Sequence, residues 1–228
     1  MLHYLRELFY ALDFASMSAA VLRVAAIILC MTVHETCHGL AAYALGDPTA
    51  KSMHRLSLNP LRHIDWLGLA LMFVAGFGWA KPVPVDLRYF KKPKQGMALT
   101  ALAGPVSNFV LAFLALLACK AIFYVPYSDG WGLAFSFCYY TAILSIGLGV
   151  FNLIPIPPLD GSKVLDVLLP ERWYHLVLRY ERYLMLAVVL LAWSGAFGGP
   201  LTAAMELVLR ELCRVVQFPF ALVEYYFF

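Results

Sequence analysis

The stretch that decides the fold is Ser18–Leu45, SAAVLRVAAIILCMTVHETCHGLAAYAL. It is long enough to cross a bilayer as a helix, which takes about 20 residues, and Gly46-Asp47-Pro48 would end it. Three ionisable residues stand within five consecutive positions of it, His34, Glu35 and His38. Such groups are costly in lipid and require a partner that neutralises them. The stretch therefore predicts a membrane-spanning helix that carries a functional site.

The composition agrees with a membrane protein. Of 228 residues, 62% are apolar and 14% are charged, whereas soluble domains carry roughly 25% charged residues. The mean hydropathy is +0.76. These values exclude a soluble domain, a disordered chain and a disulfide-stapled secreted module. The net charge of +3 is too small to indicate a nucleic-acid partner.

The rest of the chain divides into segments of different character. Two are apolar and long enough to span, Met97–Cys119 and Trp131–Leu153. The segment around 64–85 is short, rich in glycine and broken by prolines, which favours a membrane-embedded re-entrant or β segment. Three further predictions are an interfacial helix over 1–16, a shorter span over Tyr183–Phe197, and a tail over 201–228 that either spans or lies at the interface.

We therefore predict an all-α polytopic membrane protein, a helical bundle of about four to six transmembrane segments. The chain forms a single membrane-embedded domain over 1–228, with a core at 18–165 and C-terminal helices at 166–228. The loops at 47–63 and 81–95 are basic, and basic loops remain on the cytoplasmic side. This predicts a multi-pass protein of the cell membrane with its site nearer the cytoplasmic side.

The run His34-Glu35-Thr36-Cys37-His38 has the spacing of a metal site. Residues four apart lie on one face of a helix, so both imidazoles can bind one metal. Zinc lowers the pKa of water to roughly 7, and Glu35 stands where it could accept the proton. Cys37 lies about 60° from His34 on the side away from His38, so we expect it to pack rather than bind metal.

A third ligand is available at Asp160. The stretch Asn152–Gly161 contains three prolines within four residues, which cannot continue a helix. Unwound backbone at membrane depth is tolerated only where protein or a wet cavity surrounds it. The stretch could also be an ordinary helix exit with an Asp-Gly turn. With Asp160 the ligand set would be three, and an open fourth position is typical of catalytic zinc.

These motifs resemble the site-2 protease family of intramembrane zinc metalloproteases. The resemblance covers about residues 18–165 and includes Gly104–Asn108, Arg55–Pro60 and Gly76–Pro84. The chain resembles a compact member without a PDZ or CBS domain. The family cuts a substrate's transmembrane helix within the bilayer, often to release a regulator.

The resemblance also implies roles for individual residues. His34, His38 and Asp160 would bind one zinc ion per chain, and Glu35 would be the catalytic base. Asn108 and Asn152 would line the cleft and bind substrate. The implied partners are the transmembrane segment of a membrane-protein substrate and the lipid bilayer, with no nucleic acid; the sequence does not determine the oligomeric state.

Two other functions are compatible with polar residues in spans: a metal-ion transporter, and a protein that binds transmembrane segments without cutting them. A transporter needs no glutamate beside the first histidine, and a non-catalytic binder needs no Glu35. His54 and His63 flank the basic loop and could also bind metal, although surface histidines beside a membrane are more common.

Overall fold

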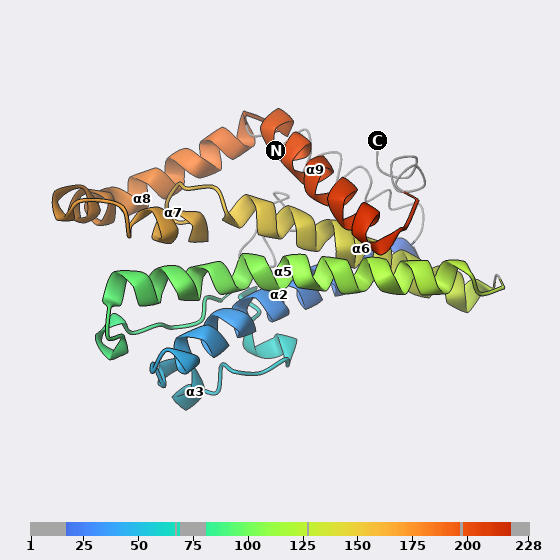
Figure 1. Cartoon of the computed structure of the whole chain (residues 1–228), viewed down its shortest axis with the longest axis horizontal. Coiled ribbons are helices and arrows are strands. Elements are labelled where there is room, and N and C mark those ends of the chain that lie inside the picture. The colour runs from blue at the N-terminus through green and yellow to red at the C-terminus, as the bar shows by residue number, and fades with distance from the viewer. Residues whose placement is uncertain (1–16, 67, 69–80, 127, 197, 220–228) are drawn as a thin grey trace.

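The computed structural model describes residues 17–66, 68, 81–126, 128–196 and 198–219 (Figure 1). The predicted interfacial helix over 1–16, most of the predicted re-entrant segment and the end of the tail lie outside the described residues. The described part is helical and contains no β-strand, which confirms the all-α prediction. Its longer helices are α2 (Met17–Ala44), α5 (Pro93–Phe123), α6 (Asp129–Asn152), α8 (Glu171–Trp193) and α9 (Gly198–Val216), and its short ones are α3 (Thr49–Ser52), η1 (Pro60–Arg62), η2 (Leu87–Tyr89) and α7 (Asp160–Leu165).

Three described helices are long and apolar enough to cross a membrane, namely α2, α5 and α6. They coincide with the three strongest predicted spans. The predicted span over Tyr183–Phe197 does not start a separate helix, because Tyr183–Trp193 continue α8 from Glu171. No proline or glycine interrupts α8, so its polar first half and apolar second half form one helix.

Helix α5 is the centre of the bundle and contacts α2, α6, α7 and α9 (Figure 1). Its buried face is made largely of small residues, which lets neighbouring helices approach closely: Gly96, Ala98, Ala101, Gly104, Ala112, Ala115 and Cys119. Its exposed face carries large apolar residues that suit a lipid environment: Leu99, Val106, Val110, Leu114 and Leu117. The pattern is that of a membrane helix, with small side chains inside and large ones outside.

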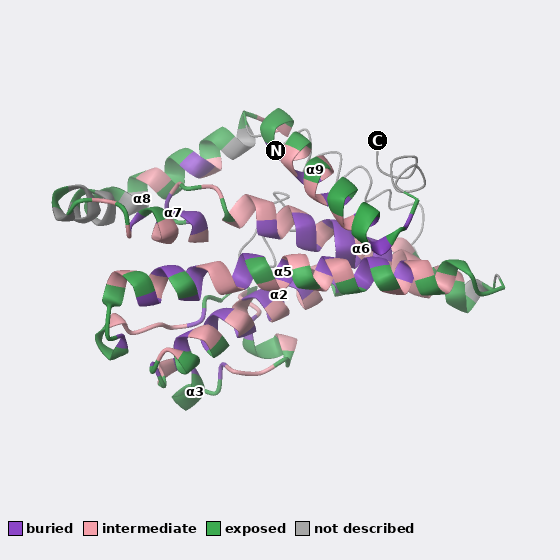
Figure 2. Ribbon diagram, in the orientation of Figure 1, coloured by how far each residue is buried: buried purple, intermediate pink, exposed green. Residues whose placement is uncertain are grey.

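The apolar core lies where α5, α6 and α9 meet (Figure 2). Leu116 of α5 and Ile146 of α6 are almost completely buried there, and Leu209 of α9 packs with them. At the end of α5 the Lys120 ammonium donates to the Val216 carbonyl at 2.8 Å, so the last turn of α9 is satisfied by a cation. This core leaves the α2 side of α5 free for polar residues.

Helix α6 ends at Asn152, and irregular backbone leads to Asp160 at the start of α7. This confirms the unwinding that the three prolines predicted. The next residue, Gly161, packs directly on the end of α6: a Cβ there would lie 2.7 Å from the Ile154 carbonyl oxygen. Glycine at this position lets α7 begin against the backbone that directly follows α6, at Leu153 and Ile154, and so helps to position Asp160.

The two flanks of the predicted re-entrant segment lie side by side. The Lys81 N–H donates to the His63 carbonyl at 2.9 Å. Residues 63 and 81 are therefore on the same side of the bundle, as the assignment of both basic loops to one membrane face requires.

Candidate metal centre

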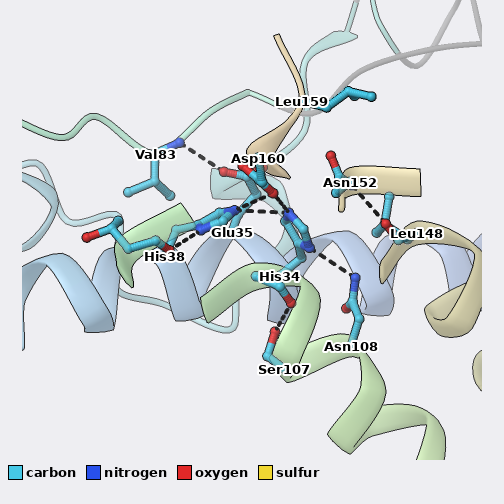
Figure 3. A network of polar contacts seen from close by, with 12 residues as sticks. His34, Glu35, His38, Val83, Ser107, Asn108, Leu148, Asn152, Leu159 and Asp160 are labelled. Carbon is cyan, nitrogen blue, oxygen red and sulfur yellow. Dashed lines mark hydrogen bonds and ion pairs between the residues drawn. The ribbon is translucent and has the colours of Figure 1, made fainter. Parts of the chain in front are cut away.

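His34, His38 and Asp160 converge on one point between α2 and α7 (Figure 3). The Nε2 atoms of the two histidines are 3.0 Å apart. The Asp160 Oδ2 atom lies 3.0 Å from His34 Nε2 and 3.2 Å from His38 Nε2. Both histidines are buried and Asp160 is partly exposed, so the group is enclosed on the helix side.

The triangle of donor atoms fits zinc. Zinc binds imidazole nitrogen and carboxylate oxygen at about 2.0–2.1 Å, so two ligands of a tetrahedral site are about 3.3 Å apart. The three observed separations, 3.0, 3.0 and 3.2 Å, are close to that value. Two imidazoles with one carboxylate also form the donor set of many catalytic zinc sites, in which the fourth position remains open.

Asp160 is ionised under ordinary conditions. Burial raises its pKa, but hydrogen bonds with His34 and His38 and their positive charge outweigh that effect, and the pKa falls to about 2. A metal-binding carboxylate must be deprotonated, so Asp160 meets that requirement across the neutral range.

Helix α5 supports the two histidines from behind. The His38 Nδ1 atom is 2.7 Å from the Thr100 carbonyl oxygen, and the His34 Nδ1 atom is 3.0 Å from the Asn108 Nδ2 atom. Between these contacts lies Gly104, where a Cβ would stand 2.5 Å from His38 Cε1 and 2.6 Å from His34 Cε1. The absence of a side chain at Gly104 is therefore what admits both rings.

Glu35 is held by a different part of the chain. Its Oε2 atom accepts a hydrogen bond from the Val83 N–H at 2.9 Å (Figure 3). Val83 belongs to residues 81–86, which have no helical or strand structure. Glu35 is only partly buried, so its second oxygen can serve a proton transfer.

Arg55 supports the segment that holds Glu35. Its guanidinium donates to the carbonyls of Lys81, at 2.6 Å, and Pro82, at 3.1 Å. A third bond goes to the Arg62 carbonyl. The side chain is buried although it is charged. The sequence marked Arg55 only as a basic loop residue and as the start of one motif, because its partners are backbone carbonyls that no residue pattern reveals.

Asn152 and Cys37, which the sequence analysis also singled out, both lie among the described residues. The Asn152 amide donates to the Leu148 carbonyl of its own helix at 2.9 Å, beside the unwound stretch that leads to Asp160. Cys37 is a free, half-buried cysteine, and it is not part of the group formed by the three proposed ligands.

The surface interpretation of the two loop histidines holds for His54, which is exposed, but is wrong for His63. His63 is buried, and its Nε2 atom donates to the Ser57 carbonyl at 2.7 Å. The loop folds back over α2, where Thr36 also donates to the Ser57 carbonyl, at 3.0 Å. This enclosure explains the burial of His63.

Comparison with known proteins identifies relatives of the chain. Residues 121–194 match the model of peptidase family M50, a range that includes Asp160 but not the His34–His38 motif. No solved structure matches the chain.

Three relatives illustrate the range of similarity. "Putative zinc metalloprotease YwhC" of Bacillus subtilis is 40% identical over 156 residues, which cover 64% of this chain and 68% of that protein. "Putative zinc metalloprotease Rip2" of Mycobacterium tuberculosis strain Erdman is 31% identical over 178 residues, 72% of this chain and 67% of that protein. "Zinc metalloprotease MJ0392" of Methanocaldococcus jannaschii is 30% identical over 86 residues, 38% of this chain and 24% of that protein.

Proposed function

Because this chain belongs to peptidase family M50, we propose that it cleaves peptide bonds within the transmembrane segments of membrane-protein substrates. Family membership makes it a membrane zinc metalloprotease that acts on protein. The observation that carries the proposal is the triangle of His34, His38 and Asp160 beside Glu35, on a helix that can span the bilayer. A site at that position can reach bonds that soluble proteases cannot.

In this proposal His34, His38 and Asp160 hold one zinc ion. When bound, zinc polarises a peptide carbonyl and makes water acidic enough to lose a proton near neutral pH. The residues supply the geometry: α2 presents two nitrogens from one face, and the start of α7 closes the triangle with a carboxylate oxygen.

Glu35 is the proposed base. It accepts one proton of the attacking water, whose oxygen bonds to the carbonyl carbon of the scissile peptide. When the carbon–nitrogen bond breaks, Glu35 returns that proton to the leaving amine. The hydrogen bond from Val83 to Oε2 orients the carboxylate and leaves Oε1 for this exchange.

The substrate helix must unwind before its backbone can enter such a site. Two features beside the ligands suit an extended backbone, the irregular stretch 153–159 and the segment 81–86 that holds Glu35. Asn152 lies at the start of the first feature, and we propose that its amide binds the substrate backbone. Pairing of a substrate with the predicted segment around 64–85 falls largely outside the described residues.

The proposed setting is the cell membrane, with the site open to the cytoplasmic side and cleavage serving regulated intramembrane proteolysis. The basic residues of the two loops support that orientation. No feature of the described residues favours the transporter or the non-catalytic binder, and Glu35 beside the ligands has no role in either.

The test compares the purified protein in detergent with its Glu35→Gln variant, using a panel of single-span substrates and measuring zinc in both. General acid–base catalysis contributes roughly 10²–10⁴-fold, so we expect the variant to lose cleavage to that extent while each protein holds one zinc ion. Glutamine still accepts the Val83 N–H, so the local structure should persist. Equal cleavage by both proteins would contradict the proposal, and so would the absence of zinc from the unaltered chain.

A further inference from the structure

We propose that Asn108 is a positioning residue for His34: its side-chain oxygen accepts the His34 Nδ1–H and so presents Nε2 to the metal. The inference rests on the proposed function, because it assumes that His34 binds zinc. It gives Asn108 a role different from the substrate contact that the sequence suggested.

The tautomer of His38 is determined by its hydrogen-bond partner. The Thr100 carbonyl, 2.7 Å from His38 Nδ1, can only accept a hydrogen bond. The proton of a neutral His38 ring must therefore be on Nδ1, and Nε2 keeps its lone pair for a metal. This is the common arrangement around metal-binding histidines, in which the second ring nitrogen donates to a neighbouring oxygen.

His34 needs the same arrangement, and Asn108 is the neighbour that can provide it. With the Asn108 Nδ2 group facing His34 Nδ1 at 3.0 Å, the ring proton must be on Nε2, where it excludes a metal. A half turn of the amide exchanges Nδ2 for Oδ1, and the oxygen then accepts the Nδ1–H. The Asn108 Oδ1 atom is buried and has no hydrogen-bond partner in the present orientation, so the half turn breaks no bond of that oxygen.

The location of Asn108 favours this role over a substrate contact. Its exposed fraction is 0%, and it lies on the far side of the His34 ring from Asp160 (Figure 3). Thr100, Gly104 and Asn108 are spaced four residues apart on α5. Thr100 faces His38, Gly104 faces both imidazole rings, and Asn108 faces His34. One stripe of α5 thus supports both histidines. A substrate would lie on the other side of the rings, toward Asp160.

The experiment measures zinc affinity by competition with a chelator for four proteins: the unaltered chain, Asn108→Leu, Asn108→Asp, and Val106→Ala as a control on the exposed face of α5. Loss of such a supporting partner lowers metal affinity about 10–100-fold, so we expect that loss for N108L. N108D should keep at least the unaltered affinity, because a carboxylate accepts the same hydrogen bond. The absorption spectrum of the cobalt(II)-loaded proteins should shift for N108L and not for V106A.

Unaltered zinc affinity in N108L would overturn the inference and leave the proposed function in place. Loss of affinity in N108D would also overturn it, since the acceptor is retained there, and this result does not depend on whether N108L folds. Failure of the unaltered chain to bind zinc would overturn the proposed function, and the inference with it. Loss of affinity in N108L together with its retention in N108D is the result that a purely space-filling role would not produce, because leucine has the same branched shape as asparagine but cannot accept a hydrogen bond.

Discussion

The proposed zinc ligands on α2 and the proposed base between them are adjacent in sequence but are supported by different kinds of structure. His34 and His38 rest on α5, a 31-residue helix packed between α2 and α6. Glu35 is held by Val83, in a segment that has no regular structure and depends on Arg55. One turn of α2 therefore faces a packed helix on one side and an irregular segment on the other.

Because of this difference, we expect metal affinity and the rate of proton transfer to respond to different substitutions. Metal affinity depends on donor atoms being held in place by helix packing, which changes little without disruption of the bundle. In the proposed mechanism, the rate of proton transfer depends on the Glu35 carboxylate, whose position is determined by residues 54–63 and 81–86. Substitutions on the α5 side should therefore remove zinc, and substitutions on the loop side should slow cleavage while zinc remains bound.

The largest effect is expected from Gly104→Ala. The added Cβ would stand 2.5 Å from His38 Cε1 and 2.6 Å from His34 Cε1, so both rings must move. We expect zinc affinity to fall on the order of 100-fold or more, and cleavage to fall with it. Metal analysis after chelator competition measures this. Gly130→Ala is the matched control, because a Cβ at Gly130 meets nothing within 4 Å; a G104A protein that binds zinc like G130A would contradict the account of α5.

A smaller effect, on cleavage and not on zinc binding, is expected from Arg55→Met. The change removes the donors to the Lys81 and Pro82 carbonyls and loosens the segment that holds Glu35. Misplacement of a catalytic group by about 1 Å costs up to roughly 100-fold, so we expect cleavage to fall tenfold or more with zinc content unchanged.

Arg55→Lys separates charge from geometry in the same assay. Lysine keeps the charge but cannot reproduce the forked donors of arginine, so its rate should lie between those of R55M and the unaltered chain. Loss of zinc in R55M would show that the loop side also controls the metal and would remove the distinction between the two sides.

The smallest effect is expected from Cys37→Ala. Cys37 stands between Glu35 and His38 in sequence but is not part of the ligand group. Substitutions away from special features change stability by about 0.5 kcal/mol or less, so zinc affinity and cleavage should stay within about twofold. Titration with zinc and a single rate measurement suffice, and a protein without zinc would make Cys37 a ligand.

The sequence predicted the three spanning helices and the unwound stretch before Asp160 well, because these features depend on local patterns. Apolar length predicted α2, α5 and α6, and three prolines predicted the end of α6 before Asp160. Helical spacing placed His34 and His38 on one face. Each of these features follows from residues close together in the chain.

The support around the site could not be predicted in the same way. The partners of His38 and Glu35 are the Thr100 carbonyl and the Val83 N–H, backbone groups that every residue possesses. Only the approach of α5 and of the loop shows which ones are used. The predicted span over Tyr183–Phe197 implied a helix start at Tyr183 that α8 does not have, because helix continuity depends on the absence of breakers rather than on a change in polarity.

The position of Asp160 determines when the site can exist. It lies 126 residues after His34, and a nascent chain emerges from its N-terminus. The helix with both histidines is therefore made long before the carboxylate that completes the proposed ligand set. Once α7 packs against α5 and brings Asp160 to the two histidines, an ion bound there would close a loop of more than half the chain, as a covalent cross-link would, and would stabilise the packed bundle against opening. If Asp160 is the third ligand, as we propose, assembly of the bundle and the onset of hydrolytic activity are a single event.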